Sequence, residues 1–272
     1  MKRKEFLQVA LPTAWLLCNG RISHATEALL DEFKSRKPLL RFVVMGDGHY
    51  GLKGTPYETY YETAINRVNA LHAEKAFDFV VMNGDIVHDD ASYLPAAKAA
   101  LDKLHPPYFV SQGNHDHIDA AGWEATWKMP VNFERKFGKT SLLIGTTSNK
   151  VGKYLSPDMG WLKTALEAHK KQEHVLLFLH INPVGLSKYA VKTEGFTALV
   201  NQYKNVKVVF NSHDHDEEDV KMKDDIPFVY CAHFGGDWGT KYCGFRVAEL
   251  YKDGSLLTYM LDPVQKRNER VL

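Results

Sequence analysis

Five short apolar runs, each ending abruptly in polar residues, constrain the fold of this chain more than any other feature. The runs are rich in Val, Leu, Ile and Phe, and Gly, Asp, Asn, Gln, Ser or His follows each of them at once. Continuous apolar runs of this length are typical of strands that are buried on both faces. The runs cover residues 39–45, 77–82, 108–110, 175–179 and 206–210.

Segments with helical spacing of their apolar residues lie between several of these runs. We predict helices over residues 57–73, 94–104 and 158–171, the last beginning after the pair Ser156-Pro157. Alternating strands and helices imply right-handed crossovers and a largely parallel sheet. Because side chains just past the carboxyl ends of such strands converge on one crevice, we expect the polar clusters to meet there.

The C-terminal part of the chain has a different pattern. Residues 228–231, 244–251 and 255–261 have the composition of strands without long helices between them, and 252–254 is a hairpin turn signal. We therefore expect a second, mostly antiparallel sheet packed against the first.

The length and composition fit one large globular domain. The chain has 272 residues, 44% of them apolar, and shows neither a repeat nor a linker. We predict a single domain over residues 26–272. The formal net charge of +1 disfavours a dedicated nucleic-acid-binding role, which usually requires a basic excess.

The N-terminus has the pattern of an export signal. A basic start at residues 2–4 precedes an apolar stretch over 6–18, and Ser23 and Ala25 are small residues suited to a cleavage site. We predict a signal peptide over residues 1–25 and export to a bacterial periplasm. The alternatives are a lipid anchor on Cys18, and a cytoplasmic protein whose N-terminal helix packs on the domain. No other stretch is long enough to span a membrane.

Two cysteines, Cys231 and Cys243, remain after removal of such a signal. Both fall on predicted strands. They could form one disulfide in an oxidising compartment or stay as two buried thiols.

Seven side chains at the predicted crevice form a set suited to metal binding. They comprise two carboxylates, one amide and four imidazoles, without a thiolate, and such a set suits Zn, Mn, Fe or Co. Seven ligands are too many for one tetrahedral ion, but a bridging carboxylate would give each of two ions four ligands. The seven are Asp47, His49, Asp85, Asn114, His180, His213 and His215.

The charge of such a site favours hydrolysis of a phosphate ester. Two divalent ions exceed the charge of two carboxylates and a bridging hydroxide, so the site attracts a phosphate anion. The ions also lower the pKa of bound water, which makes hydroxide available near neutral pH.

The order of these motifs resembles that of the calcineurin-like metallophosphoesterases. The matching motifs are Asp-x-His at 47–49, Gly-Asp at 84–85, Gly-Asn-His-Asp at 113–116, the single His180 and His-x-His at 213–215. The resemblance implies two mixed β-sheets packed as a sandwich with helices on the outer faces, in four α/β/β/α layers.

The resemblance also implies a role for each residue, with two divalent ions of Mn, Fe or Zn as cofactors. Asp47, His49 and His215 would hold one ion, Asn114, His180 and His213 would hold the other, and Asp85 would bridge them. His115 would face the oxygen of the leaving group and donate a proton, and Asp116 would orient it.

Two departures from the family pattern stand out. Ser212 occupies a position that is usually Gly, where a left-handed backbone would be easy to adopt. His49 and His88 occupy the positions of a Gly and a metal-binding Tyr in purple acid phosphatases, so a tyrosinate–iron site is not expected.

Some nearby residues have no assigned role. His88, His117 and His233 could contact substrate or serve as hydrogen-bonded loop residues. The acidic run 214–219 is either a solvated loop or a barrier to polyanions at the mouth of the site. Aromatic residues near the motifs, Trp238 among them, could stack on a ring or pack in the core.

We predict a metal-dependent phosphohydrolase that cleaves a small phosphodiester or phosphomonoester with a hydroxide on a dinuclear centre. The alternatives are a nuclease of the same superfamily, a non-catalytic interaction scaffold, and a hydrolase of a non-phosphate ester. The sequence does not indicate the substrate, the metal or the oligomeric state.

Overall fold

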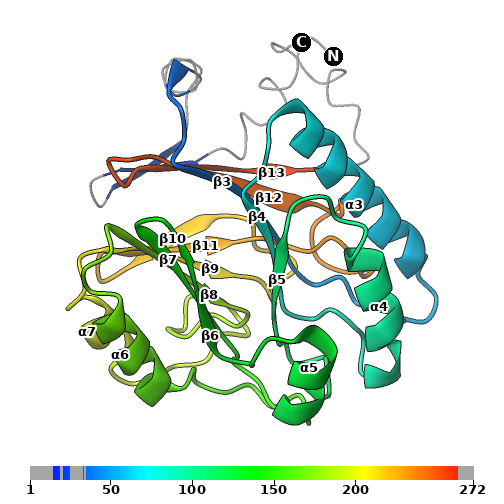
Figure 1. Cartoon of the computed structure of the whole chain (residues 1–272). Helices are drawn as coiled ribbons and strands as arrows, with labels where there is room; N and C mark the ends of the chain where they lie inside the picture. Colours follow the sequence, from blue (N-terminus) through cyan, green and yellow to red (C-terminus); the bar gives the residue numbers. More distant parts are fainter. Residues whose placement is uncertain (1–14, 19–20, 25–32, 34, 263–272) are drawn as a thin grey trace.

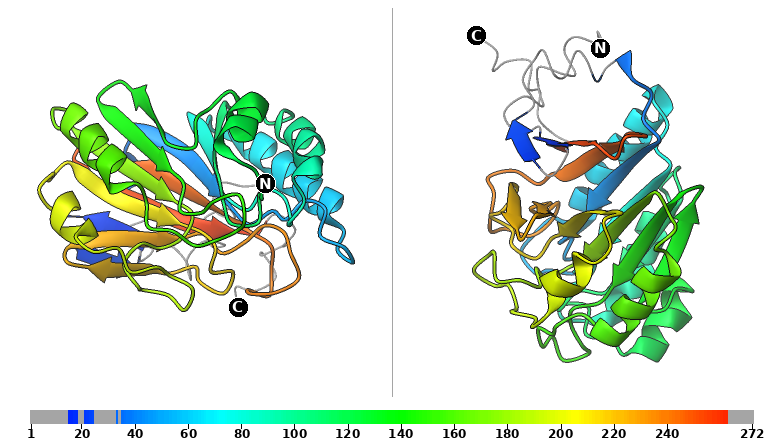
Figure 2. Two further views of the ribbon diagram at one scale, coloured as in Figure 1. Left: turned by 90° about the horizontal axis from the view of Figure 1, so that it is seen from below. Right: turned by 90° about the vertical axis from the view of Figure 1, so that its left-hand side faces the viewer.

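The computed structural model describes residues 15–18, 21–24, 33 and 35–262. These residues form two β-sheets that face each other, with helices on the outer faces (Figures 1 and 2). The prediction of a two-sheet sandwich in four layers is therefore confirmed.

The first sheet has seven strands in the order β2-β1-β13-β12-β3-β4-β5. Strands β3, β4 and β5 are parallel, whereas β12 lies between β3 and β13 and pairs antiparallel with both. The strands are β1 (Trp15–Cys18), β2 (Arg21–His24), β3 (Leu40–Met45), β4 (Phe79–Asn83), β5 (Tyr108–Ser111), β12 (Phe245–Leu250) and β13 (Leu256–Leu261).

The second sheet has six strands in the order β10-β11-β9-β8-β7-β6, of which β7, β8, β9 and β11 are parallel. The strands are β6 (Phe133–Phe137), β7 (Thr140–Gly145), β8 (His174–Leu179), β9 (Val206–Asn211), β10 (Val220–Lys223) and β11 (Ile226–Tyr230).

Alternation of side chains explains why the predicted runs are mostly apolar. In β3, Phe42 and Val44 pack in the core between the sheets, whereas Val43 and Met45 pack under the helices of the first sheet. Both faces of these strands are buried, so apolar residues occupy most positions, with exceptions such as Arg41 in β3 and Lys207 in β9.

Helices α3 (Tyr57–Glu74), α4 (Leu94–Leu101) and α5 (Ala120–Trp127) cover the first sheet. Helices α6 (Met159–Ala168) and α7 (Phe196–Val200) cover the second (Figure 1). The three predicted helices correspond to α3, α4 and α6. The carboxylate of Asp158 caps α6 by accepting a hydrogen bond from the Trp161 amide at 2.9 Å.

The predicted assignment of strands to sheets was wrong in two respects. The five apolar runs divide between the sheets, with β3, β4 and β5 in the first and β8 and β9 in the second. The C-terminal strands form no sheet of their own, because β12 and β13 pair with β3 and with each other, and β11 pairs with β9. The predicted hairpin turn at 252–254 does connect β12 to β13.

Most of the predicted signal peptide lies outside the described residues. Within it, β1 pairs with both β2 and β13. Cleavage after residue 25 would remove β1 and β2 and leave β13 as the edge strand. Export stays a prediction. No helix in the described part of the chain has the length and apolar character that a membrane crossing requires. Cys231 and Cys243 are free thiols.

Candidate metal centre

The predicted ligands lie in loops that follow β3, β4, β5, β8 and β9, and these loops meet at one edge of the sandwich. Four of the predicted ligands have a left-handed backbone: φ is 57° at Asp47, 46° at His49, 51° at Asp85 and 68° at His213. This conformation is strained for residues other than Gly, and it tends to persist at functional sites. The loops after β3 and β4 are bound together, since the amides of Gly48 and His49 both donate to the Asp85 carbonyl at 3.0 Å.

Asp47, His49 and His215 form the first cluster of potential ligands. The Nε2 atoms of His49 and His215 lie 3.0 Å apart, and His215 Nε2 lies 3.2 Å from Asp47 Oδ1. The three side chains are almost completely buried. They therefore direct nitrogen and oxygen atoms at one point, as a cation site requires.

Asp85, His180 and His213 form the second cluster. His180 Nε2 lies 3.1 Å from Asp85 Oδ2, and the same carboxylate oxygen lies 4.0 Å from His49 Nε2 in the first cluster. Asp85 thus stands between the two clusters, where a bridging ligand would be needed.

Buried atoms without hydrogen bonds support metal binding at this site. Leaving such polar atoms unpaired costs roughly 1–3 kcal/mol each, and a bound cation would satisfy them. Four of the seven predicted ligands contribute one: Asp47 Oδ1, Asn114 Oδ1, His180 Nε2 and His213 Nε2. The residues present therefore fit a pair of metal ions.

The electrostatics of the clusters also favour cations. Burial opposes a charge on His180, but Asp85 and Asp47 outweigh it and raise the pKa of His180 to about 10. The two buried carboxylates thus attract positive charge. Burial lowers the pKa of His213 to about 4, which leaves that imidazole neutral, as a ligand must be.

Backbone carbonyl groups orient two of the ligand histidines. His180 Nδ1 lies 2.7 Å from the Asn83 carbonyl, and His215 Nδ1 lies 3.2 Å from the Trp238 carbonyl. Donation of the Nδ1 proton to these oxygens makes Nε2 the nitrogen that is directed into the site.

His115 lies beside the clusters and has a different environment. Its Nδ1 atom lies 2.6 Å from Asp89 Oδ1, and its backbone amide donates to Asp85 Oδ1 at 2.8 Å. Asp89 was not predicted as a site residue, because nothing in the sequence shows that the loop after β4 folds back onto the loop after β5.

Asp116 does not make the orienting contact with His115 that we predicted. Its carboxylate is fully buried and accepts hydrogen bonds from the backbone amides of Ile86, Val87 and Gly113 at 2.7–3.0 Å. Burial and the charge of Asp85 raise the pKa of Asp116 to about 7, although these amides lower it. Asp116 therefore ties two loops together, and the contact with His115 belongs to Asp89.

The unassigned histidines occupy distinct positions. His88 contacts the ring of His49, and His117 contacts Asp89. His233 is buried and stacks against His215 with ring centroids 4.7 Å apart. His233 therefore supports a ligand from behind and does not line the cleft.

Ser212, the departure from the family pattern, fits the local backbone. The left-handed conformation falls on His213, the next residue. Ser212 instead packs against Gly46, where an added Cβ atom would lie 2.2 Å from the Ser212 hydroxyl oxygen. The small residue needed at this contact is thus supplied by Gly46.

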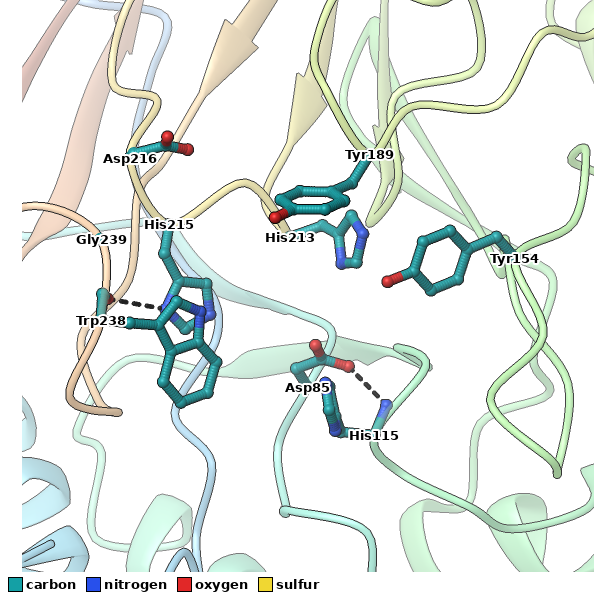
Figure 3. Close-up of a pocket in the computed structure, with 9 residues that line it drawn as sticks. All are labelled: Asp85, His115, Tyr154, Tyr189, His213, His215, Asp216, Trp238 and Gly239. Atoms are coloured by element: carbon teal, nitrogen blue, oxygen red, sulfur yellow. Dashed lines mark hydrogen bonds between the residues drawn. The ribbon is translucent and has the colours of Figure 1, made fainter.

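A cleft of about 360 Å³ opens over the two clusters (Figure 3). Three aromatic side chains, each about two-fifths exposed, line it: Tyr154, Tyr189 and Trp238. Trp238 stacks on His215 at 4.3 Å between ring centroids, and Tyr154 meets His213 edge-on at 4.6 Å. Only Trp238 was considered from the sequence, since the two tyrosines lie in loops without a motif.

The acidic run 214–219 is partly built into the site. Asp214 is buried and accepts a hydrogen bond from the Ser187 hydroxyl at 2.6 Å, whereas Asp216 lines the cleft. Asp216 therefore lies at the mouth of the site, as one of the two alternatives predicts, whereas the buried Asp214 fits neither alternative.

Comparison with known proteins identifies the family. The family model described as Calcineurin-like phosphoesterase matches residues 40–217. A probable cyclic nucleotide phosphodiesterase from Psychrobacter arcticus is 24% identical over 169 residues, which cover 55% of this chain and 61% of that protein. The match thus spans less than two thirds of this curated relative.

Solved structures share the fold. A dimetal phosphatase from Danio rerio has a TM-score of 0.65 at 15% identity, covering 84% of this chain and 98% of that one. The calcineurin-like phosphoesterase YfkN from Bacillus subtilis has a TM-score of 0.51 at 11% identity, covering 85% and 93%. The family match spans all seven predicted ligands together with His115. This chain therefore belongs to the calcineurin-like phosphoesterases.

Proposed function

We propose that this protein hydrolyses a small phosphodiester at a dinuclear metal centre held by the seven predicted ligands. The observation that carries this choice is the charge of the cleft. Its nine lining residues include neither Lys nor Arg, and Asp216 adds an acidic group outside the predicted ligands. A phosphomonoester carries up to two negative charges near neutral pH and a diester carries one, so this cleft suits the diester better.

Two further observations support a small diester. A volume of about 360 Å³ lies at the lower end of the range for pockets that hold small molecules. The curated relative is described as a probable cyclic nucleotide phosphodiesterase, and a cyclic nucleotide is a singly charged diester of suitable size.

The metal ions, when bound, would supply an activated water near neutral pH and stabilise negative charge on the phosphoryl group. Asp47, His49 and His215 would hold one ion, Asn114, His180 and His213 the other, and Asp85 both.

His115 would protonate the leaving group. Its Nδ1–H donates to Asp89 at 2.6 Å, so Nε2 is the ring nitrogen left to face the cleft. A proton on Nε2 passes to the ester oxygen as the P–O bond breaks, and the organic group leaves as an alcohol. The carboxylate of Asp89 would hold the ring in this orientation.

The hydroxyl of Tyr154 would hold the substrate. Figure 3 shows it directed into the cleft, opposite Trp238. Burial and the charge of Asp85 raise the pKa of Tyr154, so the hydroxyl stays protonated and can donate a hydrogen bond to a phosphoryl oxygen.

A substrate panel tests the proposal. We would measure kcat/KM for p-nitrophenyl phosphate, bis(p-nitrophenyl) phosphate and a 3′,5′-cyclic nucleotide, with Mn²⁺, Zn²⁺ or Fe²⁺ added in turn. We expect the diesters to be preferred by about tenfold or more, equivalent to about 1.4 kcal/mol. A preference for the monoester with every metal would overturn the proposal. The Asp85→Ala variant, purified in parallel, controls for contaminating phosphatases.

A further inference from the structure

His88 stands between a predicted metal ligand and the predicted proton donor. Its Nδ1 atom lies 3.1 Å from Nδ1 of His49, and its ring stacks on that of His115 with centroids 4.8 Å apart and planes 12° apart. The side chain is 23% exposed. His88 therefore contacts one residue of each functional group through a different part of its ring.

The contact with His49 has a defined direction if His49 binds a metal. His49 Nε2 faces the first cluster, 3.0 Å from His215 Nε2, so Nε2 must be the unprotonated nitrogen of a ligand. The proton of the neutral His49 ring then sits on Nδ1. His88 Nδ1 accepts that proton in a hydrogen bond, and the proton of His88 itself sits on Nε2.

The carboxylate of Asp89 lies near the rings of both His88 and His115. One carboxylate oxygen lies 2.6 Å from His115 Nδ1, and the other lies 3.8 Å from His88 Nε2. The Asp89 amide also donates to the His115 carbonyl at 2.9 Å. The dipeptide 88–89 thus connects the first metal cluster to the ring of His115.

We propose that His88 is a positioning residue with two separable actions. Its Nδ1 atom fixes the tautomer and orientation of His49 for metal binding, and the face of its ring holds the imidazole of His115 in place. The inference rests on the proposed roles of His49 and His115.

Two substitutions separate these actions. His88→Asn keeps an acceptor oxygen near the position of Nδ1 but removes the stacked ring, whereas His88→Phe keeps a ring but removes the acceptor. Calorimetric titration of the metal-free full-length protein with Mn²⁺ or Zn²⁺ measures the affinity of each ion without substrate.

We expect His88→Phe to weaken binding of one of the two ions by about 10–100-fold, as losses of outer-shell partners usually do. His88→Asn should keep wild-type affinity for both ions. At saturating metal, His88→Asn should instead lower kcat on a diester with a poor leaving group, while His88→Phe should retain it.

The contrary results are equally clear. Wild-type affinity for both ions in His88→Phe, or equal losses in both variants, would overturn the proposal. His117→Asn, which removes a neighbour of Asp89 without a contact to His49, is the control and should leave metal affinity unchanged. Since the titration needs no substrate, a failure of the proposed diesterase activity would not alter its outcome.

Discussion

The imidazole of His115 is held by a carboxylate, whereas the ligand histidines His180 and His215 are held by backbone carbonyl groups. In His180 and His215, Nε2 lies within 3.2 Å of a carboxylate of the two clusters, whereas in His115 the carboxylate contact is made by Nδ1 and goes to Asp89, outside the clusters. This difference separates the proposed proton donor from these two proposed ligands. It also sharpens the assignment taken from the motif, which gave His115 its role only by resemblance.

Replacing His115 by Ala should therefore leave metal binding intact and slow the reaction. We expect kcat to fall by about 10²–10⁴-fold on a diester with a poor leaving group, because general acid catalysis typically contributes that much. The loss should be smaller with p-nitrophenolate, which leaves readily without a proton. Equal losses on both substrates, measured at matched metal content, would argue against the acid role.

Asp89 and Asp116 provide a matched test of which carboxylate serves His115. Asp89→Asn should lower kcat on poor leaving groups by about tenfold while leaving the thermal midpoint unchanged, because this residue is about half exposed and contacts the ring. Asp116→Asn should mainly lower stability, because its amide N–H₂ can no longer satisfy all three backbone donors. We would measure kcat and the melting curve of both variants. A loss of kcat in Asp116→Asn, with unchanged kcat in Asp89→Asn, would restore the orienting role first predicted for Asp116.

Among the elements, the loop between β11 and β12 packs closely against a predicted metal ligand. Gly239 has φ of 102°, and a Cβ atom there would lie 2.3 Å from the Cβ and 2.5 Å from the carbonyl oxygen of His215. The loop also supplies the Trp238 carbonyl and indole ring that hold His215. Its path is thus fixed by close backbone packing and positions one ligand of the first cluster.

Gly239→Ala should push this loop away from His215 and weaken metal binding. Gly54→Ala is the control, because Gly54 also has a left-handed backbone, with φ of 86°, but no atom lies within 4 Å of an added Cβ. Both variants bear the backbone strain, of order 1–2 kcal/mol, but only the first bears the clash. The melting temperature should fall in both variants. Metal titration should show a loss of affinity in Gly239→Ala alone. Equal metal affinities in the two variants would show that the loop does not position His215.

For the strands, the sequence predicts which polar residues follow each strand, but it does not predict which strands are neighbours in a sheet. Burial on both faces makes β3 and β8 apolar at all but one position each, Arg41 and His174, so their runs identify them as interior strands but do not show to which sheet each belongs. The pairing of β12 with β3 joins residues about 200 positions apart, as Arg246 with Val44, and no local pattern encodes it. Strand β7 was missed because its apolar run ends in Gly145 and two threonines, without a ligand to draw attention to it.

Across the whole molecule, each ligand cluster joins the two sheets. In the first cluster, Asp47 follows a strand of the first sheet and His215 follows a strand of the second. In the second cluster, Asp85 comes from the first sheet and His180 from the second. Each ion would thus bind groups from both halves of the sandwich, and its binding energy would stabilise their packing.

Removing the metals should therefore lower the melting temperature of the protein. An ion present at 100 times its dissociation constant stabilises the folded state by about 2.7 kcal/mol, which corresponds to a shift of about 5–10 °C in a protein of this size. Without ions, a proton on His180 offsets only one of the two negative charges of Asp47 and Asp85 at neutral pH.

We would measure melting curves by calorimetry before and after chelation, with metal analysis of each sample. The shift should reverse when Mn²⁺ or Zn²⁺ is restored, and it should be largely absent in Asp85→Ala, whose missing carboxylate serves both ions. An unchanged midpoint in protein shown to be metal-free would mean that the sandwich packs independently of its metal centre.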